Sequence, residues 1–143
     1  MILSKATGYG IRALVYLAQQ TQGRPCGLRE IADAEVIPSV YLRKILGELR
    51  RHRILKSSKG IHGGYELFRT PEQITLWEVF QILDPNPEFV ECPYCQSTSL
   101  HNGQCPLHED WNRIRAEFFE LLKNKTIAQM KKGDQETRLK AEL

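Results

Sequence analysis

Three cysteines and one histidine lie close together in the sequence, at a spacing that suits metal chemistry. The pattern is Cys92-Pro-Tyr-Cys95, nine further residues, and Cys105-Pro-Leu-His108, so three thiolates and one imidazole fall within seventeen residues. Thiolate and imidazole are ligands of tetrahedral Zn²⁺, and the same set can bind the iron of an iron–sulfur cluster. The spacing therefore predicts a metal site formed by Cys92, Cys95, Cys105 and His108.

The spacing predicts a metal without selecting one. Zinc would suit a site with a purely structural role. An iron–sulfur cluster would suit a sensor, because the irregular loop would be ordered only while the cluster is bound. A thioredoxin-like redox pair at Cys92 and Cys95 needs a strand–helix context, which this proline-broken segment lacks. His101 is expected to be solvated, and the isolated Cys26 is expected to be a partly buried apolar residue.

The distribution of charge indicates a second site. The net charge is only +3, but residues 39–59 hold seven Lys or Arg and one acidic residue, which gives +6. Residues 72–112 hold seven acidic residues and no Lys or Arg, which gives −7. Such polarity within one chain indicates two different activities at two places. The cysteine pattern lies in the acidic segment.

The elements that must position these sites begin with helices. Apolar residues recur at helical spacing over residues 4–20, 28–35 and 39–53, and Pro38 forces a tight connection between the second and third segments. Two short helices joined by a short turn, the second of them basic, form the helix-turn-helix pattern. The first helix has a second apolar strip, which could face another subunit. That strip consists of Ile11, Val15 and Ala18.

The period then changes from helical to alternating. Residues 54–59 and 65–68 predict two short strands, with Gly60, Gly63 and Gly64 between them. A helix-turn-helix followed at once by a basic, glycine-rich hairpin predicts a winged helix. Its basic residues could form an ordinary solvated face, but their place on the second helix and in the wing favours nucleic-acid binding. They are Arg43, Lys44, Arg50, Arg51, Arg53, Lys56 and Lys59.

The C-terminal half predicts a capped helix, a long loop and a long helix. Thr75-Leu76-Trp77-Glu78 is a capping box, and residues 85–110 show neither helical nor strand period. A loop of that length in a compact protein is usually functional. The helix after it carries an apolar stripe that predicts either core or a dimer seam. The stripe consists of Trp111, Ile114, Phe118, Leu121 and Leu122.

We therefore predict a mainly α fold: a winged helix-turn-helix region with a two-stranded wing, followed by a long C-terminal dimerisation helix. The DNA-binding region spans residues 1–84, and the cysteine-rich loop spans residues 85–110. A dimerisation helix and a short end helix, capped by Thr126, occupy residues 111–130. Residues 131–143 are expected to be a disordered polar tail.

Length and composition argue against several classes of protein. A chain of 143 residues is short for a Rossmann or barrel enzyme, and no nucleophile–base arrangement is present, so we expect neither an enzyme nor a small-molecule substrate. No run of 18 apolar residues exists, so no membrane partner is expected. The first residues lack a signal-peptide pattern, and the expected location is cytoplasmic.

The order of these parts resembles the Rrf family of winged-helix transcriptional regulators, which includes the IscR, NsrR and CymR groups. The resemblance covers about residues 1–130. The matching stretches are residues 3–4, 8–14, 28–32, 37–46, 60–67 and 74–76.

The resemblance implies a homodimer that binds a pseudo-palindromic operator in double-stranded DNA. It also implies that the second helix of the pair reads bases or phosphates, and that the wing touches phosphate or the minor groove. Arg43 is suited to guanine, whose O6 and N7 accept a bidentate pair of hydrogen bonds. The expected DNA contacts are Ser39, Tyr41, Arg43, Lys44, Arg50, Arg51, Lys56, Lys59, His62, Gly63 and Gly64.

For the loop, the resemblance implies an iron–sulfur cluster whose gain, loss, oxidation or nitrosylation changes operator affinity. Cys105 and His108 resemble a family pattern in which both ligate a 2Fe–2S cluster, and Cys92 occupies the place of the first family cysteine. Cys95 departs from the family spacing, so 4Fe–4S is an alternative to the favoured 2Fe–2S. Some members use an acidic ligand from the partner's first helix, where this chain has Gly8. The competing functions are a regulator with structural zinc and, more distantly, a small thiol redox protein.

Overall fold

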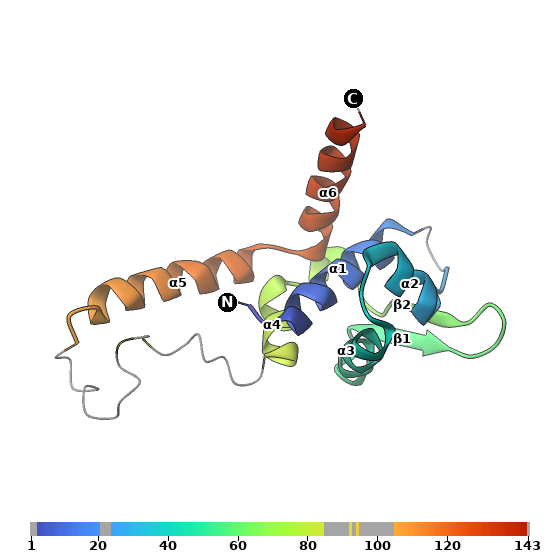
Figure 1. The fold of residues 1–143 in the computed structure, drawn as a ribbon, viewed down its shortest axis with the longest axis horizontal. Helices are drawn as coiled ribbons and strands as arrows, with labels where there is room; N and C mark the ends of the chain where they lie inside the picture. The colour runs from blue at the N-terminus through green and yellow to red at the C-terminus, as the bar shows by residue number, and fades with distance from the viewer. Residues whose placement is uncertain (1–2, 21–23, 85–91, 93, 95–104, 143) are drawn as a thin grey trace.

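A computed structural model describes residues 3–20, 24–84, 92, 94 and 105–142 (Figure 1). The described part is mainly α-helical with one antiparallel two-stranded sheet, which confirms the predicted fold class. In chain order, the elements are α1 (Lys5–Gln19), α2 (Leu28–Glu35), α3 (Ser39–Arg51), β1 (Leu55–Ser58), β2 (Gly64–Leu67), the 3-10 helix η1 (Pro71–Gln73), α4 (Leu76–Leu83), α5 (His108–Asn124) and α6 (Ile127–Ala141).

Helices α2 and α3 and the β1–β2 hairpin form the predicted winged helix. Leu55 of β1 pairs with Leu67 of β2, and the hairpin gains a third backbone partner where Cys26 bridges to Tyr65. Figure 1 shows this hairpin at one end of the molecule, while α5 extends away from the body at the other end. The wing and the long helix are therefore separate projections from one body.

The core forms around α1, which packs against α2, α3, α4 and α6. Leu14 of α1, Ile31 of α2 and Leu46 of α3 are all fully buried. The second apolar strip of α1 is also buried, because α6 of the same chain packs against α1. That strip is thus already covered within one chain. Within this core, a Cβ on Gly10 would lie only 2.4 Å from the Leu83 side chain, so α1 and α4 approach closely there.

The apolar stripe of α5 is divided between the core and the surface. Leu122 is 3% exposed and belongs to the core of its own chain, which removes it from the predicted dimer seam. Phe119, which adjoins the stripe, packs on Trp77 of α4 with ring centroids 4.9 Å apart. Ile114 and Leu121, by contrast, are half exposed, at 50% and 51%. The base of α5 is therefore anchored on α4, while part of its stripe remains open.

The predicted disordered tail is wrong, because α6 continues as a helix to Ala141. Two features stabilise it. A full capping box joins Thr126 and Gln129 at its start, and Asp134 accepts a hydrogen bond from Gln19 of α1 at 2.6 Å. The polar composition of residues 131–141 suggested a tail, but Asp134 contacts α1 and Arg138 contacts α2. None of the helices in the described ranges is long and apolar enough to cross a membrane.

The turn between α2 and α3 contains a strained residue that yields a stability prediction. Val36 has φ 53° and ψ 51°, the left-handed region, and its side chain is 83% exposed. A β-branched residue is disfavoured there by about 1–2 kcal/mol, whereas glycine adopts this conformation readily. We expect Val36→Gly to raise the free energy of unfolding by about 1 kcal/mol in urea denaturation.

Val40→Gly is the matched control, because Val40 is also exposed, at 70%, but lies in α3. Glycine is unfavourable in a helix, so this variant should be less stable than the wild type. A Val36→Gly protein no more stable than the wild type would contradict the strain assigned to the turn.

Candidate functional site

Helix α3 presents the predicted DNA-reading side chains to solvent. Its buried stripe, Leu42, Ile45, Leu46 and Leu49, fixes the rotation of the helix against the core. The opposite face is exposed, and it carries six of the predicted contacts. They are Ser39, Tyr41, Arg43, Lys44, Arg50 and Arg51.

The basic residues of this face differ in their partners. Arg50 donates to the Ser57 hydroxyl at 3.2 Å and so joins α3 to β1, and Arg51 pairs with Glu48 at 3.2 Å. Within the described part of the chain, neither Arg43 nor Lys44 forms an ion pair. These two cations are therefore free to meet an anionic partner, whereas Arg50 stabilises the relation between helix and wing.

The wing continues the basic surface. Lys56 pairs with Glu66 across the hairpin at 3.4 Å, while Lys59 and His62 lie exposed near the tip. Gly63 and Gly64 occupy positions where backbone approaches backbone. A Cβ on Gly63 would lie 2.4 Å from the Ser58 carbonyl oxygen, and one on Gly64 would lie 2.4 Å from the Cys26 carbonyl oxygen. Close packing thus accounts for both glycines before any DNA contact is considered.

Cys26 is an apolar packing residue, as the sequence predicted, and its burial is complete. Its backbone exchanges hydrogen bonds of 2.9 and 2.8 Å with Tyr65 of the wing. Burial and the nearby Glu30 carboxylate raise the pKa of the Cys26 thiol. Because the thiolate is the reactive and metal-binding form, Cys26 is not suited to nucleophilic or ligand chemistry at neutral pH.

Cys92 and Cys105 lie together at the beginning of α5. They are 8% and 6% exposed, Trp111 packs against them, and their Sγ atoms are 3.8 Å apart. A disulfide would need about 2.05 Å. Two thiolates on one tetrahedral metal, with metal–sulfur bonds of about 2.3 Å, lie about 3.8 Å apart. The pair therefore fits two ligands of a common metal centre.

The other predicted ligands are placed differently. His108 is the first residue of α5 and is exposed, and its Nε2 lies 3.0 Å from the Asn112 amide nitrogen. Cys95 and His101 lie outside the described residues. Among the residues that are placed, no three potential metal ligands come together. The structure thus brings together two of the four predicted ligands, with His108 three residues beyond Cys105 on the adjoining helix.

The segment made of the cysteine-rich loop and α5 is attached to the winged-helix body before the loop and after α5. Asp84, directly before the loop, accepts hydrogen bonds from the Thr7 hydroxyl at 2.5 Å and from the Ser4 backbone at 3.3 Å, both at the start of α1. After the loop, α5 leads to a junction where Ile127 N–H donates to the Ile74 carbonyl at 2.9 Å. The stretch from the loop to the end of α5 is therefore attached at Asp84 to α1 and at Ile127 to the segment that precedes α4.

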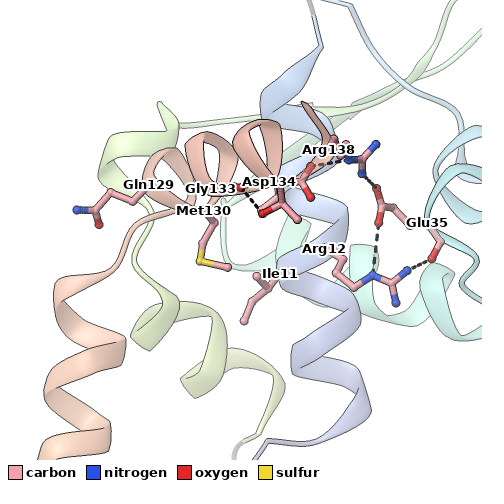
Figure 2. A pocket seen from close by; sticks show the side chains of 10 residues that line it. Ile11, Arg12, Glu35, Gln129, Met130, Gly133, Asp134 and Arg138 are labelled. Carbon is pink, nitrogen blue, oxygen red and sulfur yellow. Dashed lines mark hydrogen bonds and ion pairs between the residues drawn. The ribbon is translucent and has the colours of Figure 1, made fainter. Parts of the chain in front are cut away.

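A buried carboxylate that the sequence analysis missed joins α6 to the helix-turn-helix (Figure 2). Glu35, the last residue of α2, has a side chain only 11% exposed. Its carboxylate meets Arg12 Nε of α1 at 3.4 Å and Arg138 Nη2 of α6 at 3.6 Å. Arg12 also donates to the Glu35 carbonyl, and Arg138 pairs with Asp134 at 2.9 Å.

We call Arg12, Glu35 and Arg138 the α6 clamp. Beside it lies a cavity of about 380 Å³ with apolar walls from Ile11, Val15 and Met130. No local motif marks the clamp, because its members come from three elements far apart in the chain. The only sequence signals for these ion pairs were the acidic residue at the end of α2 and the basic residues of α6.

Comparisons with known proteins agree on one family. The family described as "Rrf2: Iron-dependent Transcriptional regulator" matches residues 3–133. The chain is 30% identical to an HTH-type transcriptional regulator NsrR of Shouchella clausii, over 89% of this chain and 86% of the relative.

Two solved structures are also similar. CymR, described as the global cysteine regulator of B. subtilis, has a TM-score of 0.78 at 25% identity and covers 92% of this chain and 97% of its own. T. potens IscR has a TM-score of 0.76 at 26% identity, with coverages of 96% and 90%.

The α6 clamp yields a second stability prediction. Glu35→Gln keeps the size of the side chain but leaves Arg12 and Arg138 without their carboxylate. Since both arginines are about half exposed, at 47% and 60%, we expect a loss of about 1–2 kcal/mol, between the values for exposed and buried pairs. Urea denaturation measures the loss, and amide hydrogen exchange should show faster exchange in α6.

Glu136→Gln is the matched control, because Glu136 lies on the exposed surface of the same helix. This control should change stability by less than about 0.5 kcal/mol. If the two variants are equally stable, Glu35 does not hold α6 in place.

Proposed function

The chain belongs to the Rrf2 family of DNA-binding transcriptional regulators, and from this premise we propose that it is a sequence-specific regulator controlled by an iron–sulfur cluster. In this proposal two copies bind a pseudo-palindromic operator, and the cluster bound by each loop alters their affinity for it. The proposal is carried by two features found in one chain. Arg43 and Lys44 are exposed on α3 without an ion pair among the described residues, and two buried thiols lie 3.8 Å apart at the start of α5.

The proposed DNA contacts divide by chemistry. Arg43 and Lys44 project from α3, which in this proposal enters the major groove, where Arg43 suits guanine. Ser39 and Tyr41 lie on the same exposed face. Cations of the wing, Lys59 foremost, contact phosphates, so their contribution falls steeply with salt. Base contacts set the preferred sequence, and phosphate contacts set the overall affinity.

A second copy of the chain is proposed to cover α5. Ile114 and Leu121 are half-exposed apolar residues on a helix that extends away from the winged-helix body (Figure 1). Pairing of two such helices would bury these residues, together with the partly exposed Trp111 and Phe118. Two winged helices would then be available for successive half-sites, about one helical turn of DNA apart.

The proposed cluster ligands are Cys92, Cys95, Cys105 and His108, with 2Fe–2S favoured and 4Fe–4S or zinc as alternatives. When bound, the cluster supplies a redox- and nitric oxide-sensitive group at the start of α5. Contacts within the chain connect the start of α5 to α3. Helix α5 leads to α6, and the α6 clamp ends at Glu35, next to the turn that precedes α3. A shift of α5 and α6 can therefore change how α3 is presented.

Arg43 and Lys59 provide the test of sequence-specific binding. Operators are first obtained by selection from random duplexes with the wild-type protein. Arg43→Ala should then lose discrimination at one base pair of each half-site, of about 1–3 kcal/mol. Lys59→Ala should weaken binding to all sequences alike and reduce the slope of log K against log salt by about 1. The proposal is contradicted if both variants lose specificity equally, or if the wild type selects no sequence.

The metal assignment is tested by analysis of anaerobically purified protein. We expect visible absorption from a cluster, with iron and sulfide present. Cys92→Ser and Cys105→Ser should each lose most of the iron and sulfide, because each removes one of the paired thiolates. Cys26→Ala is the matched control and should retain both, since Cys26 lies under the wing. Colourless protein with one zinc per chain would favour the structural-zinc alternative, and full metal in Cys92→Ser would remove Cys92 from the ligand set.

A further inference from the structure

Ile61 is the most exposed large apolar side chain among the described residues, at 97%. It lies at the tip of the wing between β1 and β2, and the neighbouring Lys59 and His62 are exposed as well. Single apolar residues on a surface are common and need no explanation. Ile61 differs because a basic hairpin carries it at its outermost point.

The turn that carries Ile61 is well fixed. Gly63 N–H donates to the Gly60 carbonyl at 3.0 Å, and Gly60 has φ +104°, a conformation that suits glycine. The close approach of Gly63 to the Ser58 carbonyl leaves no room for a side chain between the two arms of the turn. Isoleucine is itself stiff at χ1, so burying it against a partner costs little conformational entropy.

The wing is also fixed relative to α3. Arg50 of α3 donates to Ser57 of β1 at 3.2 Å, and the Cys26–Tyr65 bridge ties β2 to the segment before α2. If α3 enters a major groove, a wing fixed in this way would extend along the DNA toward the adjacent minor groove. Lys59 and His62, which are exposed beside Ile61 in the turn, would then lie near the phosphates of that groove.

On the basis of the function proposed above, we propose that Ile61 packs into the minor groove beside each half-site and selects A·T over G·C there. An apolar side chain finds sugar edges and the groove floor in an A·T pair. In a G·C pair it meets the protruding N2 amino group of guanine, which needs a hydrogen-bond acceptor that isoleucine lacks. Apolar side chains are common in minor-groove recognition. Ile61 is thus a specificity-determining residue distinct from Arg43.

The test uses the full-length protein and the selected operator. At the flanking positions under the wing, located by hydroxyl-radical footprinting, A·T pairs are replaced by G·C or by inosine·C, which lacks the N2 amino group. The wild type should bind the A·T and inosine·C duplexes alike and the G·C duplex about tenfold more weakly. Ile61→Ala should bind A·T about tenfold more weakly than the wild type and lose the discrimination. A tenfold loss of affinity corresponds to losing the burial of about two methylene groups of the isoleucine side chain.

Two controls isolate the apolar contact. Leu139→Ala removes an apolar side chain that is 63% exposed on α6, away from the wing, and should leave binding unchanged. Ile61→Ala should keep the wild-type salt dependence, since it removes no charge. Discrimination that persists in Ile61→Ala, or affinity within twofold of the wild type, would overturn the role of Ile61. A wild type that selects no sequence would instead overturn the proposed function, and this inference with it.

Discussion

The attachment of α6 to the helix-turn-helix depends on the buried carboxylate of Glu35. This residue ends α2, its side chain is 11% exposed, and it lies between Arg12 of α1 and Arg138 of α6. A carboxylate in such a position needs cationic partners, because its desolvation is otherwise costly. The polar C-terminal helix is therefore held against α1 and α2, and the turn that follows Glu35 leads directly into α3.

The acidic segment with its thiol pair and the basic surface of α3 and the wing are connected through α5 and α6. The thiol pair lies at the start of α5 in the acidic segment, and the unneutralised cations lie on α3 and in the wing. Between them run the aromatic packing of Phe119 on Trp77 and the α5–α6 junction at Ile127. These contacts lie at the C-terminal end of α5, whereas the thiol pair lies at its start, so α5 itself joins the two places. A displacement of the whole of α5 would therefore move its junction with α6.

The local patterns of the sequence were sufficient to predict the winged helix. Helical spacing located α1 to α3, and alternation with glycines located the hairpin, because each of these signals lies within one element. The prediction of a disordered tail was wrong because tertiary contacts hold α6, and tertiary contacts also decide between the core and seam alternatives for Leu122. Residues 131–141 are polar, yet they fold against α1, and Leu122 belongs to the intrachain core rather than the seam. The α6 clamp could not be predicted from spacing, since its three residues are far apart in sequence.

In the proposed function, the state of the cysteine-rich loop controls how α3 meets DNA. The most direct measurement is the operator affinity of one wild-type preparation, before and after removal of its cluster, over a range of salt concentrations. We expect the two affinities to differ by about fivefold or more at every salt concentration, which is the lower end of allosteric coupling. Equal affinities of the loaded and unloaded protein throughout would contradict this proposal and leave the metal a structural role only.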